Sequence, residues 1–120
     1  PNALSADLIM VYFLTRGERG ELSDGLDGPG SKAAITYSKP NGNGNRTVWV
    51  TYDNDETWTI DNLDGHKLDF FTATVHELGH ALGLDHAPHP GAVMYDTLGA
   101  GARAKPSGAD ENPMRRLYGL

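Results

Sequence analysis

The stretch His76-Glu77-Leu78-Gly79-His80-Ala81-Leu82-Gly83-Leu84-Asp85-His86 decides how the rest of the chain is interpreted. Two histidines four residues apart in a helix share one face, so His76 and His80 can offer imidazole nitrogens to one metal ion. Gly83 can adopt a positive φ without a steric cost, so the chain can turn there and bring His86 round as a third ligand. Three protein ligands leave the fourth position of a tetrahedral zinc open, which is the arrangement of catalytic sites.

Glu77 and Met94 complete this candidate site. Glu77 directly follows the first histidine, where its carboxylate can act as a general base on water. Met94 is expected to form an apolar floor beneath the metal without binding it. The shorter pattern His-Glu-x-x-His also occurs by chance in helices that bind nothing, but here the glycine and the third histidine fall at the required offsets. The full pattern is therefore typical of a zinc peptidase.

The composition favours a single globular domain. Of the 120 residues, 38% are hydrophobic and 22% are charged, which is enough for a modest core. The net charge of −6, with no basic cluster, argues against nucleic-acid binding, and no apolar run is long enough to cross a membrane. The absence of cysteine excludes disulfides, cysteine zinc sites and thiol catalysis.

Three segments have the composition of β-strands. Ala6–Leu14 is almost continuously apolar, which predicts a central strand buried on both faces, with a buried helix as the alternative. Lys32–Tyr37 predicts a short edge strand, and Thr47–Tyr52 alternates β-branched and aromatic residues as strands do. The carboxylates of Asp53-Asn54-Asp55-Glu56 follow directly and suit either a solvated turn or a calcium loop.

A helical pattern extends from about residue 68 to 84. One apolar stripe runs along it, formed by Phe71, Val75, Leu78 and Leu82. We expect this stripe to pack inward while the histidines face a cleft. The irregular segment 87–108 is long enough to suggest a functional loop. Asn112 as an N-cap and Pro113 in the first turn predict a short last helix over Pro113–Tyr118.

Several segments outside the histidine motif resemble the matrixins, the matrix metalloproteinase family of metzincin zinc peptidases. The matching segments are Ala6–Met10 with Arg16-Gly17, Leu26–Gly30, Tyr52–Thr59 and Leu117-Tyr118-Gly119. The second of these is similar to the Phe-Asp-Gly-Pro-Gly loop of the family, with Leu26 in place of Phe. The third is similar to its Phe-Asp-x-Asp-Glu-x-Trp segment. Together they are more specific than the zinc motif alone.

The resemblance implies an α+β, metzincin-like fold. A small twisted mixed sheet of about three strands would pack on the active-site helix, followed by an irregular C-terminal subdomain and a short terminal helix. The whole chain, residues 1–120, would form one catalytic domain, with the sheet and active-site helix in 1–86 and the Met-turn in 87–120. The resemblance also implies a protein or peptide substrate and a secreted, extracellular location.

A calcium site is implied beside the zinc site. Its ligands would be the side chains of Asp27, Asp53 and Glu56 and the backbone carbonyls near Gly28, Gly30 and Lys32. Calcium takes six or more oxygens, which these two loops could supply. The family also holds a structural zinc with three histidines and an aspartate. The corresponding positions here are Arg19, Glu21, Ile35 and Thr51, so we expect one catalytic zinc and no structural zinc.

Two departures from the family pattern bear on function. Asp96 stands where the family has the proline of its Met-Tyr-Pro turn, and Leu98 stands where a tyrosine is usual. These positions wall the pocket for the substrate residue after the cut, so its specificity stays open. Matrixin catalytic domains also carry two further N-terminal strands and a long helix that backs the sheet. A dimer or a partner chain could cover the sheet face that this helix would occupy.

Three functions are open at this point. The first is a zinc endopeptidase that uses Glu77 as general base and binds an extended peptide along Ala33–Thr36. The second is a zinc-binding peptide module without turnover, or a fragment that needs a missing N-terminal segment or a partner. The third is a structural zinc site, for which His89 is the nearby fourth ligand. The complete motif and its open coordination position favour the endopeptidase.

Overall fold

The computed structural model describes residues 6–15, 17–23, 26, 33–42, 44–97 and 99–120. In chain order, the elements are β1 (Ala6–Leu14), the 3-10 turn η1 (Gly20–Ser23), β2 (Ala34–Pro40), β3 (Arg46–Asp53), β4 (Trp58–Thr59), β5 (Leu68–Asp69), α1 (Phe70–Ala81) and α2 (Gly108–Tyr118). This confirms the predicted α+β fold with a small mixed sheet, a helix packed on it and a C-terminal helix. No helix in these ranges is long and apolar enough to cross a membrane.

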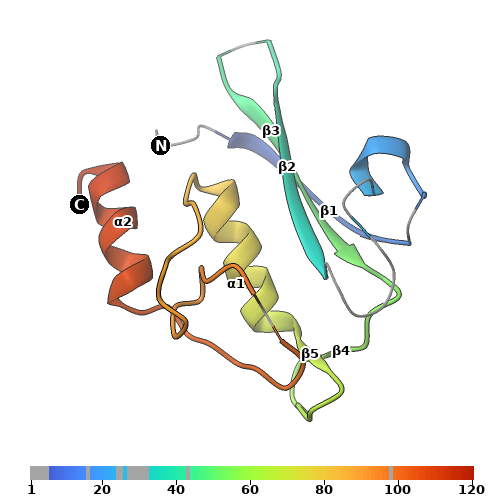
Figure 1. The fold of residues 1–120 in the computed structure, drawn as a ribbon. Helices are drawn as coiled ribbons and strands as arrows, with labels where there is room; N and C mark the ends of the chain where they lie inside the picture. Colours follow the sequence, from blue (N-terminus) through green and yellow to red (C-terminus); the bar gives the residue numbers. More distant parts are fainter. Residues whose placement is uncertain (1–5, 16, 24–25, 27–32, 43, 98) are drawn as a thin grey trace.

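The main sheet has the strand order β1-β3-β2, so β3 is its central strand (Figure 1). β1 runs parallel to β3 and β2 runs antiparallel to it. The prediction that Ala6–Leu14 is a central strand buried on both faces is wrong. In the described part of the chain β1 is an edge strand, and four of its apolar side chains are exposed: Leu8, Ile9, Val11 and Phe13. Its composition therefore indicates a surface that another element would cover.

Helix α1 packs under β2 and β3 (Figure 1). The core between them contains Val50, Tyr52 and Ala73, with Ala34, Trp58 and Phe70 packed against it. The Tyr52 hydroxyl also lies 2.7 Å from the Thr74 hydroxyl, which ties β3 to the helix. The buried Asp69 side chain accepts a hydrogen bond from the Thr72 amide and caps the N-terminus, so the helix begins after β5, two residues later than predicted.

The prediction that the apolar stripe of α1 packs inward is also wrong. Phe71 is 61% exposed, and Val75, Leu78 and Leu82 are exposed as well. The side of α1 that is buried carries Thr72, Ala73, His76, Glu77, Gly79 and Ala81. The helix thus presents small and polar residues to the structure around it, and its most apolar side faces outward.

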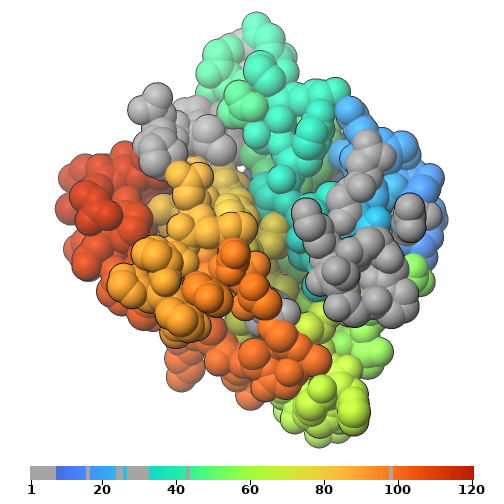
Figure 2. All heavy atoms as spheres, in the orientation of Figure 1, coloured from blue at the N-terminus to red at the C-terminus, as the bar shows by residue number. Residues whose placement is uncertain are grey.

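The C-terminal part forms a second small core around Met94. Its buried members are Leu84, Ala87, Ala92, Val93 and Met94, against which Ala104, Ala109, Met114 and Leu117 pack. Figure 2 shows the segment after α1, in orange, lying across the front of the molecule between α2 in red and the sheet edge in teal. The Tyr118 hydroxyl donates to the Leu82 carbonyl at 2.6 Å, which joins the C-terminal ends of the two helices.

Helix α2 begins at Gly108, so the predicted start at Asn112 and Pro113 is wrong. The actual N-cap is Ser107, whose amide donates to the Asp110 carboxylate at 2.8 Å in a capping box. Pro113 lies inside the helix, where it removes one backbone hydrogen bond. The capping box determines the start of this helix, and its sequence signal is the Ser-x-x-Asp spacing of Ser107 and Asp110.

Candidate metal centre and active site

The structure brings together the three histidines of the motif. His76 and His80 lie one turn apart on α1, and Gly83 has a φ of 102°, as the predicted turn requires. The chain then reverses, so that His86 faces the other two rings, with ring centroids 5.2 Å from His76 and 4.8 Å from His80. One ligand atom from each residue lies within 4.8 Å of the others. This spacing fits a single metal ion.

Backbone carbonyls orient the two histidines of α1. The Nδ1 atom of His76 is 2.7 Å from the Val93 carbonyl oxygen, and that of His80 is 2.8 Å from the Leu84 carbonyl oxygen. Because a carbonyl only accepts hydrogen bonds, each Nδ1 carries a proton, and Nε2 is the ring atom left to bind a metal. Such support is typical of imidazoles that bind metals. Imidazole nitrogens are ligands that zinc takes.

The surroundings of His86 favour its neutral form. Desolvation lowers the pKa of His86, and the proximity of His80 and His76 lowers it further, against the weaker opposing effects of Asp96 and Glu77. A neutral imidazole is the form that can bind a metal. The electrostatics of the cluster therefore favour the protonation state that a metal site needs.

Glu77 lies beside the histidines and is only 6% exposed. Its Oε2 atom is 3.8 Å from His76 Nε2, so this oxygen faces the metal-binding side of the cluster. Its Oε1 atom is 2.8 Å from the hydroxyl of Thr36, which projects from β2. The carboxylate is therefore held between the sheet edge and the histidines.

Met94 lies against α1 at Gly79 and is 1% exposed. A Cβ atom at Gly79 would lie 2.4 Å from the Met94 sulfur, so only a glycine allows this close approach. Because Gly79 directly precedes His80 on α1, the thioether packs next to the histidine-bearing turn. Met94 is therefore a buried apolar side chain beside this turn, and its role as an apolar floor stays a prediction.

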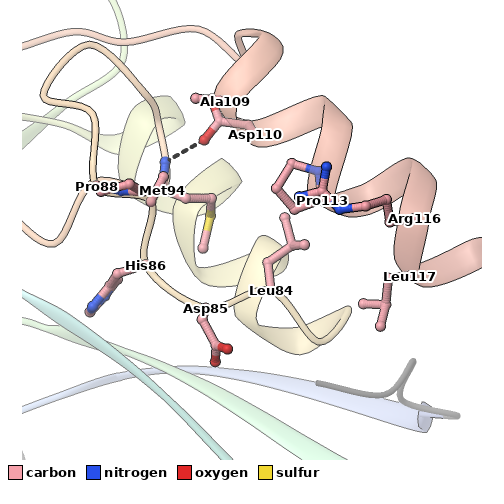
Figure 3. A pocket seen from close by; sticks show the side chains of 11 residues that line it. Leu84, Asp85, His86, Pro88, Met94, Ala109, Asp110, Pro113, Arg116 and Leu117 are labelled. Atoms are coloured by element: carbon pink, nitrogen blue, oxygen red, sulfur yellow. Dashed lines mark hydrogen bonds between the residues drawn. The ribbon is translucent and has the colours of Figure 1, made fainter.

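Asp110 supports this floor, and sequence reasoning missed it. Its carboxylate accepts a hydrogen bond from the Val93 amide at 3.0 Å. It also accepts one from the Met94 amide at 2.9 Å (Figure 3). Burial raises the pKa of Asp110, but hydrogen bonds from Ser107, Met94 and Val93 outweigh it, so the pKa lies below its ordinary value. Val93 also accepts a hydrogen bond from His76 through its backbone carbonyl. Val93 therefore links Asp110 on α2 to the first histidine.

The structure describes only part of the predicted calcium site. Asp53 is fully buried, and its Oδ1 atom accepts a hydrogen bond from the Asp55 amide at 3.0 Å. Glu56 is half-buried, and its amide donates to the Asp53 carbonyl at 3.2 Å. The other proposed ligands lie outside the described residues: Asp27, Gly28, Gly30 and Lys32. Two of the six predicted ligands therefore lie close together, Asp53 at the end of β3 and Glu56 in the turn that follows.

The alternative of a closed structural zinc site receives no support from His89. Among the residues that the structure describes, the group that could hold a metal consists of His76, His80 and His86. His89 is exposed and is not part of that group. Three converging histidines would leave one position of a tetrahedral metal ion open, which is the arrangement of catalytic sites.

Comparison with known proteins agrees with this geometry. A sequence model of the matrixin family matches residues 3–119. Matrilysin from Homo sapiens is 40% identical over 115 residues, which cover 92% of this chain and 40% of matrilysin. Stromelysin-1 from Equus caballus is 37% identical over 115 residues, or 92% of this chain and 22% of the relative. Matrix metalloproteinase-15 from Homo sapiens is 43% identical over 86 residues, or 72% and 12%. The chain thus spans less than half the length of these relatives.

Proposed function

Because the chain belongs to the matrixin family, we propose that it is a zinc-dependent endopeptidase, with residues 1–120 acting as one catalytic unit. The observation that carries this proposal is the convergence of three imidazoles beside one buried carboxylate. His76, His80 and His86 would hold the zinc, and the fourth position would receive substrate or water. On the family resemblance, we place the protein outside the cell.

Each residue of the site has a defined task in hydrolysis. When bound, zinc supplies a Lewis acid that polarises the scissile carbonyl and lowers the pKa of the attacking water. Glu77 takes a proton from that water and passes it to the leaving amine. The carbonyls of Val93 and Leu84 keep the proton of His76 and His80 on Nδ1. Met94 excludes water from beneath the site.

The sheet edge next to Glu77 suits an extended substrate. β2 is an edge strand, and Thr36 on this strand contacts Glu77 directly. A peptide that added to β2 near residues 33–36 would pair with its backbone and lie along the histidine cluster. The exposed Asp96 follows the Met94 turn and would help to shape the pocket for the residue after the cut. Leu98, which is predicted to line the same pocket, lies outside the described residues.

Cleavage of a mixed peptide library by the purified chain, read by mass spectrometry with and without a zinc chelator, tests the proposal. We expect chelator-sensitive cuts before hydrophobic residues. The absence of cuts from a folded chain that carries one zinc would contradict the endopeptidase and favour a zinc-binding peptide module. Chelator-resistant cuts would show that a different chemistry, or a contaminating protease, is responsible.

Exposed apolar side chains on β1 and α1 favour an arrangement in which a second polypeptide covers them. The apolar side chains of Val11 and Phe13 on β1 and of Phe71 and Val75 on α1 are exposed in the described structure. Phe13 stacks on Phe70 and Tyr52, so these residues of β1 face the side of the sheet on which α1 lies. Exposed apolar side chains that gather on neighbouring elements are typical of an interaction site. We propose that a second copy of the chain covers it.

Light scattering during size-exclusion chromatography checks this arrangement. We expect a dimer at micromolar concentration, and we expect Phe71→Ser with Val75→Ser to give a monomer. A monomeric parent chain with full peptidase activity would show that the face needs no cover. A monomer that cleaves only after a partner is added would assign the face to that partner.

We further propose that calcium binds at the turn after β3, and Asp53→Ala tests this site. Calcium at about 100 times its dissociation constant stabilises a folded chain by about 2.7 kcal/mol, which raises the melting temperature by several degrees. We expect Asp53→Ala to remove this calcium-dependent rise, and the matched change Asp61→Ala at an exposed carboxylate to keep it. An equal loss of stability in calcium and in chelator would contradict the site, since Asp53 also accepts a bond from Asp55.

A further inference from the structure

Thr36 contacts the proposed general base from the sheet. It lies in β2 opposite Val50 of β3, on a strand held in register over seven residue pairs. Its hydroxyl oxygen is 2.8 Å from Glu77 Oε1 and 3.1 Å from the Glu77 backbone carbonyl. A threonine hydroxyl has a single proton to donate. The carboxylate is the nearer and stronger acceptor, so this proton goes to Oε1.

The two oxygens of Glu77 therefore have different surroundings. Oε1 accepts from Thr36, while Oε2 lies 3.8 Å from His76 Nε2 and faces the histidine cluster. Glutamate has three rotatable side-chain bonds, and a single anchored oxygen removes much of that freedom. Because Glu77 is buried, water does not replace this bond freely. The hydroxyl thus determines which oxygen is available for proton transfer.

We propose that Thr36 is a positioning residue, whose hydroxyl holds Glu77 Oε1 so that Oε2 is aimed at the reacting water. This inference rests on the proposed endopeptidase function and adds a residue to its machinery. Thr36 is on the strand along which we expect the substrate to bind. The same strand would therefore align both the scissile bond and the base that serves it, which is the geometry that rapid proton transfer requires.

Thr36→Val and Thr36→Ser form a matched pair of variants. Valine keeps the shape and the strand preference of threonine but has no hydroxyl, whereas serine keeps the hydroxyl. We expect Thr36→Val to lower kcat by about 10- to 100-fold, since a misplaced catalytic group costs rates of this order, with KM and zinc content changed less than about twofold. Thr36→Ser should restore most of kcat. Equal kcat values for the parent and Thr36→Val would overturn the positioning role.

A double-mutant cycle on melting temperature, measured in chelator, tests the contact without activity. Thr36→Val is made in the parent and in Glu77→Ala, which keeps the backbone carbonyl and lacks the carboxylate. We expect the drop in melting temperature to be about 5 °C larger in the parent, as a hydrogen bond to a buried charge implies. Equal drops would overturn the contact. A parent chain that cleaves nothing, with a non-additive cycle, would instead contradict the endopeptidase function and leave Thr36 as a structural partner of Glu77 only.

Discussion

Glu77→Ala is expected to abolish measurable cleavage while the chain still binds one zinc. General acid–base catalysis contributes about 10²- to 10⁴-fold to the rate, and Glu77 is the buried carboxylate beside the three histidines. It is not one of the three residues that converge as ligands, so the metal should stay bound. Turnover of a fluorogenic peptide and zinc content by mass spectrometry of the native protein measure the two quantities separately.

Two further variants sharpen this test. Glu77→Gln keeps the size of the side chain and an oxygen that can accept from Thr36, but its amide cannot take a proton, so we expect the same loss of kcat. Glu111→Ala removes an exposed carboxylate on α2 and should leave turnover unchanged. Turnover retained in Glu77→Ala would contradict the assignment of the base. Zinc lost together with turnover would show that the carboxylate helps to build the metal site.

The candidate site was largely predictable because its geometry is local. His76 and His80 are one helical turn apart, and the turn that brings His86 to them requires only a positive φ at Gly83. Contacts between segments that are far apart in the chain have no comparable pattern in the sequence. Thr36 and Glu77 are separated by 41 residues, and only the packing of α1 against β2 brings them together. The spacing of Ser107 and Asp110 predicts a capping box, but the sequence does not predict that Asp110 also binds the amides of Val93 and Met94.

The errors about β1 and about the apolar stripe of α1 share one physical cause. Composition identifies β1 and the outer side of α1 as apolar, but it does not say whether another element covers them. In the described structure Ile9 and Val11 on β1, like Phe71 and Val75 on α1, are exposed. Periodicity predicts which face of an element is apolar, and burial depends on every other element that is present.

Asp110→Ala is expected to give the largest loss of stability of any single substitution considered. The carboxylate is 5% exposed and accepts hydrogen bonds from the Val93, Met94 and Ser107 amides. Removing it leaves buried donors unsatisfied, at about 1–3 kcal/mol each, and also removes the capping box of α2. A total of about 3–5 kcal/mol is a large part of the stability of a small domain. Urea titration of the chelated protein measures it.

Asp110→Asn provides a variant that should still fold, because its amide oxygen keeps one acceptor of nearly the same shape. The pKa of Asp110 is lowered in the folded protein, so this group stabilises the fold at pH values above its unfolded pKa of about 3.8. That contribution is lost as the pH falls through the lower folded pKa. We therefore expect the free energy of unfolding of the parent to fall steeply below about pH 4. We expect that of Asp110→Asn to be smaller above this pH and to change less over this range. Parallel pH profiles of the two proteins would show that the bonds from Val93 and Met94 do not depend on the charge of Asp110.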